Sequence, residues 1–153
     1  MQRIFHTPEG VRDIYSQEYS RKQKLQEKLH RVFHQYGFED IETPTFEYFE
    51  VFSKEVGTIP SRELYKFFDR EGNTLVLRPD FTPSVSRACA TYFNPEKEVV
   101  SLCYTGNTFI NNSSFRGRLK ETTQMGVERM GDDSPEADAE ILAMTVECLL
   151  ATG

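Results

Sequence analysis

Residues 104–131 read YTGNTFINNSSFRGRLKETTQMGVERMG, and this stretch decides the predicted fold. Two strand-like runs flank a polar centre at residues 111–114, and residues 115–117 close the loop between the runs. This order is typical of a long antiparallel β-hairpin with a wide loop. We expect the rest of the chain to be organised around this hairpin.

The second run of the hairpin has two unlike faces, because successive side chains of a strand point to opposite sides. One face is polar and takes Arg118, Lys120, Thr122, Gln124, Gly126 and Glu128. The other is more apolar and takes Leu119, Glu121, Thr123, Met125, Val127 and Arg129. The pattern alone favours an ordinary sheet with one solvated face. The alternative is a pocket floor for a small zwitterion, with arginine at its carboxylate and Gln and Glu at its ammonium group.

The bulk composition is that of one globular domain. The chain has 153 residues, and a hydrophobic fraction of 38% with 12 Phe and 7 Tyr argues against disorder. A formal charge of −6 disfavours broad electrostatic capture of nucleic acid. Cys89, Cys103 and Cys148 are widely spaced and odd in number, which favours reduced thiols. With no apolar leader and no run as long as a membrane span, we expect a soluble, cytoplasmic protein.

Metal and cofactor motifs find no support in the sequence. His30 and His34 lie four residues apart in a helical pattern, a spacing that allows metal binding. No acidic base stands between them as in HExxH, so a solvated helix face is favoured and we expect no metal site. The phosphate-binding loops GxGxxG and Walker A and the hydrolase motif GxSxG are absent from the sequence.

The order of the local patterns predicts an α+β fold on a largely antiparallel sheet. A helix is expected over residues 16–36, where apolar residues recur at helical spacing before Gly37. The other expected elements are an edge strand, or a strand leading into an interface, over residues 38–45, a short helix over 46–52, a loop over 57–62, hairpin strands over 64–69 and 74–77, a helix from Thr82 to about residue 93, and a last helix from Pro135. Thr82 and Ser134 are the expected caps of the last two helices, each followed by a proline.

The candidate site residues come from two predicted strands: Arg78, Asp80 and Thr82 end the first, and Arg118, Gln124 and Glu128 share one face of the second. If these strands lie near each other, an acid pair could hold an ammonium group while an arginine holds a carboxylate. Taken alone, residues 78–80 favour a simpler interpretation, a turn stabilised by a local ion pair.

Several motifs resemble the catalytic domain of class II histidyl-tRNA synthetases, in order and almost without gaps. They are TPEGVRD at residues 7–13, the motif 1 segment at residues 36–47, LRPDFT at residues 77–82 beside the family's LRPEGT, and QMGVE at residues 124–128 beside its HQxGxE. The resemblance implies a class II synthetase-like antiparallel sheet with flanking helices, of which residues 1–153 form the N-terminal part. It also implies dimerisation through motif 1 and a histidine pocket made by Asp80, Thr82, Arg118, Gln124 and Glu128.

Motif 2 is where this sequence departs from an active synthetase. That family carries FRxE at the start of the hairpin loop, where the arginine grips the α-phosphate of ATP and the acid helps to place the nucleotide. In a gapless match these two positions are Ile110 and Asn112. Loss of the guanidinium would remove a contact that contributes on the order of 2–4 kcal/mol, or roughly 100- to 1000-fold in rate. We therefore expect a retained histidine pocket without adenylation chemistry.

This combination resembles a paralogous synthetase-like family, the regulatory subunits of ATP phosphoribosyltransferase in histidine biosynthesis. RPDFT at residues 78–82, ETTQMGVE at residues 121–128 and EADAE at residues 136–140 also resemble that family. The resemblance implies a non-catalytic subunit without a cofactor, which assembles with the short-form catalytic subunit and takes part in feedback inhibition by histidine; tRNA binding is not expected. Two alternatives stay open: a fragment of a histidine–tRNA ligase, and a dimerisation module whose vestigial pocket binds no histidine.

Overall fold

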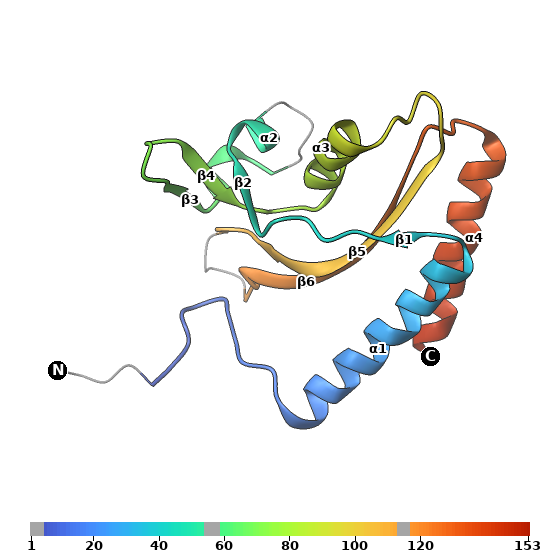
Figure 1. The fold of residues 1–153 in the computed structure, drawn as a ribbon. Coiled ribbons are helices and arrows are strands. Elements are labelled where there is room, and N and C mark those ends of the chain that lie inside the picture. The colour runs from blue at the N-terminus through green and yellow to red at the C-terminus, as the bar shows by residue number, and fades with distance from the viewer. Residues whose placement is uncertain (1–4, 54–58, 113–116) are drawn as a thin grey trace.

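The computed structural model describes residues 5–53, 59–112 and 117–153 (Figure 1). Part of the predicted hairpin loop therefore lies outside the described residues, as does the start of the loop predicted over residues 57–62. No helix in the described part of the chain is both long and apolar enough to cross a membrane.

A long hairpin forms the centre of the fold. Its strands β5 (Val100–Phe109) and β6 (Glu121–Met130) pair antiparallel along their whole length, with Tyr104 opposite Gly126. The predicted hairpin is thus confirmed. The short strand β1 (Glu39–Asp40) adds to the free edge of β5 and runs parallel to it, so the sheet is not purely antiparallel. The proline-containing segment after Phe38 is an edge strand, as predicted, although only two of its residues pair.

A second, antiparallel sheet has the strand order β2 (Phe46–Tyr48), β4 (Thr74–Leu77) and β3 (Lys66–Phe68). The predicted hairpin of β3 and β4 is confirmed. The predicted helix over residues 46–52 is wrong, because its first half pairs with β4 and only α2 (Glu50–Ser53) is helical. A 3₁₀ turn at Ser61–Glu63 precedes β3.

Three longer helices cover the two faces of the hairpin (Figure 1). Helices α1 (Ser16–Gln35) and α4 (Pro135–Thr152) contact each other, and Lys28 of α1 donates a hydrogen bond to the Ala151 carbonyl of α4 at 3.2 Å. Helix α3 (Thr82–Tyr92) lies on the opposite face. The three predicted long helices are therefore confirmed, and the molecule has a helix–sheet–helix layering.

Successive side chains of β5 point to opposite faces of the sheet and pack into two separate cores. Leu102 and Tyr104 pack with Phe81, Val85 and Cys89 under α3. Cys103, between them in the sequence, points to the other face, where the second core consists of Val32, Phe33, Phe38, Cys103 and Met144. Met125 and Val127 of β6 are half-buried and pack against this second core, so the apolar face predicted for this strand packs in part, while Leu119 and Thr123 on the same face are exposed.

The two proline-containing helix starts differ from each other. Ser134 caps α4 as predicted, since its hydroxyl accepts a hydrogen bond from the Ala137 backbone N–H at 3.2 Å. The predicted cap at Thr82 is wrong: this residue is already the first of α3, and Phe81 occupies the cap position. The hydroxyl of Thr82 instead donates a hydrogen bond to Glu128 of β6.

Candidate binding site

The turn between β4 and α3 is fixed by Arg78, whose side chain is buried. Its guanidinium donates to three backbone carbonyls: Asn107 at 2.8 Å, Thr43 at 2.8 Å and Pro44 at 3.3 Å. The local ion pair predicted within residues 78–80 is therefore wrong, because the Arg78 guanidinium bonds carbonyl groups of other segments and not the Asp80 carboxylate. Burial lowers the pKa of Arg78, and the nearby Glu42 charge opposes this shift. Arg78 joins the two sheets rather than facing a ligand.

Two stacked aromatic rings form the floor of the site. Phe81 and Tyr104 lie with ring centroids 4.4 Å apart and nearly parallel, at 9°. Two glycines leave room for this stack. A Cβ on Gly126 would lie 2.4 Å from the Tyr104 hydroxyl oxygen, and a Cβ on Gly106 would lie 2.7 Å from the Phe81 ring. The glycine in QMGVE therefore has a packing reason: only a residue without a side chain lets the tyrosine cross β6.

Four of the five predicted site residues come together above this floor. The Thr82 hydroxyl donates to the Glu128 carboxylate at 2.6 Å. The Gln124 amide donates to Asp80 at 3.4 Å, and the same Asp80 oxygen accepts the Phe81 backbone N–H at 2.7 Å. We call Asp80, Thr82, Gln124 and Glu128 the polar cluster.

The fifth predicted residue, Arg118, lies apart from the polar cluster. It precedes β6 and is exposed, and it forms no hydrogen bond with any of the four clustered residues. A strand rises about 3.3 Å per residue, so six positions of extended chain between Arg118 and Gln124 would span roughly 20 Å. The structure thus brings four of the five predicted pocket residues together from segments far apart in the sequence, and Arg118 is not among them.

The electrostatics of the polar cluster favour a cationic ligand. Burial is the main cause that raises the pKa of Glu128; the Asp80 carboxylate adds to it and the Thr82 hydrogen bond opposes it. Burial, with help from the charges of Glu128 and Asp80, also raises the pKa of Tyr104 to about 12. Two acids are thus crowded into a partly buried space, and a bound ammonium group would relieve their repulsion.

Sequence reasoning missed Tyr104, although it stacks on the turn that supplies Asp80 and Thr82. The signal that could have found it is the strand register, because Tyr104 stands directly opposite the glycine of QMGVE. The two motif 2 positions lie just beyond β5. Ile110 donates its backbone N–H to the Lys120 carbonyl at 2.9 Å, and the Asn112 amide donates to the Leu119 carbonyl at 3.4 Å.

A separate cavity of about 780 Å³ lies between the segment before α1, α1 itself and the hairpin. Its lining includes Arg12, Glu18, Lys22, Thr123 and Met125, and none of the five predicted site residues. Residues of the polar cluster form close contacts across α3 and β6 rather than surrounding this space. The candidate site is therefore the polar cluster, which is separate from this cavity.

Comparisons with known proteins agree with this architecture. The family model for histidyl-tRNA synthetase matches residues 10–153. An ATP phosphoribosyltransferase regulatory subunit from Ruminiclostridium cellulolyticum is 43% identical over 148 residues, which cover 97% of this chain and 35% of that protein. This chain therefore spans about a third of the length of that relative.

Solved structures give the same likeness. A protein from Bacillus halodurans C, described as an ATP phosphoribosyltransferase regulatory subunit/histidyl-tRNA synthetase, superposes with a TM-score of 0.86 at 33% identity, over 100% of this chain and 39% of that chain. A histidine–tRNA ligase subunit from Alicyclobacillus acidocaldarius gives a TM-score of 0.83 at 25% identity, over 100% of this chain and 44% of that chain. The predicted class II synthetase-like fold is confirmed.

Proposed function

Because this chain belongs to the histidyl-tRNA synthetase family, we propose that it is a non-catalytic regulatory subunit of ATP phosphoribosyltransferase. That enzyme catalyses the first step of histidine biosynthesis. The observation that carries the proposal is the 43% identity, over nearly the whole chain, to a protein named as such a subunit. The sequence supports it at motif 2, where the family's phosphate-gripping arginine is matched by Ile110. The proposed partner is the short-form catalytic subunit, and the widely spaced free cysteines suit a reducing compartment, the cytoplasm.

We assign the polar cluster to the ammonium group of histidine. Asp80 and Glu128 supply negative charge, Gln124 an amide oxygen, and Thr82 orients the Glu128 carboxylate. Arg118 is kept as the proposed carboxylate partner, and its exposed place before β6 requires it to approach the site when the ligand binds. Histidine would then inhibit the complex by binding an inactive arrangement more tightly than the active one.

Dimerisation through the motif 1 region has support from the exposed face of the second sheet. Phe46 and Tyr48 of β2 are 50% and 54% exposed, and Phe67 of β3, on the same face, is 36% exposed with its ring centroid 5.6 Å from that of Phe46. The intervening Glu47 is buried and paired with Arg87 of α3 at 2.7 Å, so the aromatic side chains are held outward. Exposed aromatic patches of this kind mark protein–protein contacts. Light scattering should report a smaller species for Tyr48→Glu than for the unaltered protein; an equal mass would contradict this surface.

The test of the function uses the full-length gene product and a short-form ATP phosphoribosyltransferase from the same organism. Phosphoribosyl transfer to ATP is measured with each protein alone and with both, in the presence and absence of histidine. The proposal expects activity only in the mixture and inhibition by histidine. Transfer that is equal without this chain would refute it.

A histidine–tRNA ligase fragment stays the second candidate, because a ligase subunit shares the fold at a TM-score of 0.83. The ligase requires histidine-dependent exchange of pyrophosphate into ATP, which the Ile110 substitution should prevent. Exchange above background in the full-length product would favour the ligase. A vestigial dimerisation module, the third possibility, predicts neither activity nor histidine binding.

A further inference from the structure

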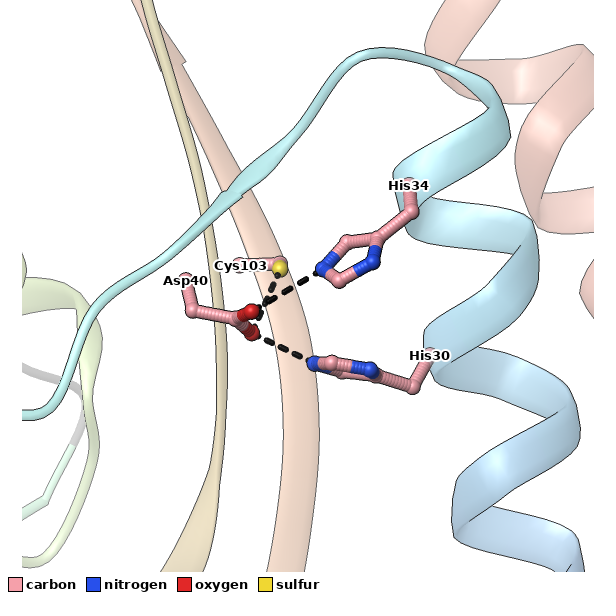
Figure 2. Close-up of side chains that lie close together, drawn as sticks. All are labelled: His30, His34, Asp40 and Cys103. Atoms are coloured by element: carbon pink, nitrogen blue, oxygen red, sulfur yellow. Dashed lines mark hydrogen bonds and ion pairs between the residues drawn. The ribbon is translucent and has the colours of Figure 1, made fainter.

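Four potential metal ligands meet at the end of α1, on the face of the hairpin opposite the polar cluster. They are His30 and His34 of α1, Asp40 of β1 and Cys103 of β5, and Figure 2 shows their side chains converging. One ligand atom from each residue lies within 4.8 Å of all the others. We call these residues the His–Asp–Cys cluster.

The local sequence explains why the cluster forms. Residues four apart on a helix share a face, so both histidines project to the same side of α1. Gly37 follows the helix with φ +78°, a left-handed conformation that turns the chain back toward the hairpin. In the parallel pairing of β1 with β5, Asp40 then stands opposite Cys103. The cluster thus depends on a register between segments more than 60 residues apart.

The other three members of the cluster all contact the Asp40 carboxylate. The Asp40 carboxylate contacts the Nε2 atoms of both His30 and His34, the latter at 3.0 Å. The Cys103 thiol donates to the same carboxylate at 3.5 Å. The two imidazole rings have centroids 4.2 Å apart. The thiol is fully buried, while both imidazoles and the carboxylate reach solvent, which gives an ion an entry path.

We propose that His30, His34, Asp40 and Cys103 bind one divalent transition-metal ion, with Zn²⁺ as the best match. Two imidazole nitrogens, a carboxylate oxygen and a thiolate suit Zn²⁺, whereas Mg²⁺ and Ca²⁺ prefer all-oxygen sites. Tetrahedral Zn²⁺ bonds of about 2.0–2.3 Å place ligand atoms roughly 3.3–3.8 Å apart, so closing the cluster needs shifts of about 1 Å. Four protein ligands leave no open position, and the site is structural: it fastens α1 to β1 and β5.

A metal-free alternative is a hydrogen-bonded His–Asp–His contact beside an inert thiol. Burial, followed by the charge and hydrogen bond of Asp40, raises the pKa of Cys103 to about 12, so the thiol holds its proton when no ion is present. Zn²⁺ binds cysteine as a thiolate, so metal binding would release the thiol proton. The hydrogen-bonded alternative predicts that the four residues bind no metal ion.

The test uses the intact protein, purified with a chelator and a phosphine reductant and then titrated with Co²⁺ as a spectroscopic probe. We expect a thiolate-to-cobalt charge-transfer band and the visible bands of four-coordinate Co²⁺, both saturating at one ion per chain and removed by Zn²⁺. At 100-fold excess over Kd, Zn²⁺ should raise Tm by about 5–10 °C. Cys148→Ser and His6→Gln, which alter a thiol and an imidazole outside the cluster, should change neither result.

Two ligand variants decide the assignment. Cys103→Ser should abolish the charge-transfer band. His34→Gln, at an exposed position that should tolerate the change, should weaken Co²⁺ binding by more than the roughly 10- to 100-fold that loss of an outer partner costs. No charge-transfer band in the unaltered protein would overturn the proposal. So would a band that survives Cys103→Ser, or, if that variant does not fold, Co²⁺ affinity unchanged by His34→Gln.

Discussion

The packing of Tyr104 over Gly126 makes a sharp prediction for Gly126→Ala. An added Cβ would lie 2.4 Å from the tyrosine hydroxyl oxygen, 2.6 Å from Cζ and 3.0 Å from Cε2. These atoms belong to a rigid ring and not to a flexible chain end. The ring cannot retreat easily, because it stacks on Phe81 at 4.4 Å and both residues are buried in the core under α3.

The expected cost follows from overpacking. Forcing a methyl group into a filled core costs about 1–3 kcal/mol. Replacing glycine by alanine also restricts the unfolded chain, which returns about 0.4–1 kcal/mol. We therefore expect Gly126→Ala to lower the free energy of unfolding by about 1–2 kcal/mol. For a chain of this size that corresponds to a fall in Tm of about 2–8 °C.

The assay is urea unfolding followed by circular dichroism, with Tyr104→Phe and the double variant as partners. Removing the hydroxyl removes the shortest clash, so Gly126→Ala should cost less in the Tyr104→Phe background than in the unaltered protein. This coupling isolates the contact from general effects of the added methyl group. Stability of Gly126→Ala equal to that of the unaltered protein, or strictly additive effects in the double variant, would refute the reasoning.

Two further predictions concern the residues around the site. Arg78→Lys should lower the free energy of unfolding by about 2–4 kcal/mol, because one ammonium group cannot serve three separated carbonyls; a loss below about 1 kcal/mol in urea unfolding would contradict this. Glu128→Gln should raise Tm at neutral pH, because burial raises the pKa of Glu128 and its charge is disfavoured in the folded state. A raised carboxyl pKa means that the folded protein binds the proton more tightly, so this advantage should shrink as the pH falls below the folded-state pKa of Glu128 and vanish below the pKa of the unfolded chain. Melting curves across acidic to neutral pH test it, and a variant less stable than the parent at neutral pH would count against it.

The elements that sequence reasoning predicted well are those whose signal is local. Helical periodicity with Gly37, and the cap at Ser134, are contained within single segments, and the alternation along β6 sorts its residues onto the correct faces. The strand β2 was missed because its central Glu47 is buried. That burial depends on Arg87, which lies 40 positions away and pairs with Glu47 at 2.7 Å.

The site was predicted only in part, because some of its residues share a local pattern and others meet through contacts between distant segments. Gln124 and Glu128 share a face of one strand, and motif resemblance added Asp80 and Thr82 from another segment. The bond from Thr82 to Glu128 could not be read from the chain, since a serine- or threonine-proline pair more commonly marks a helix cap. Likewise, His30 and His34 look like a solvated helix face until the parallel register places Asp40 beside them.

The most direct measurement is calorimetric titration of the intact protein with histidine, using the unaltered protein, Glu128→Gln and Glu121→Gln. Glu121 is the matched control, because it lies on the opposite face of the same strand and is bonded to Asn107. Loss of a charged hydrogen-bond partner costs about 1.5–3 kcal/mol. We predict one histidine site whose affinity falls about 10- to 150-fold in Glu128→Gln and is unchanged in Glu121→Gln. Equal affinity in all three proteins, or no binding to the unaltered protein, would contradict the assignment of the polar cluster to histidine.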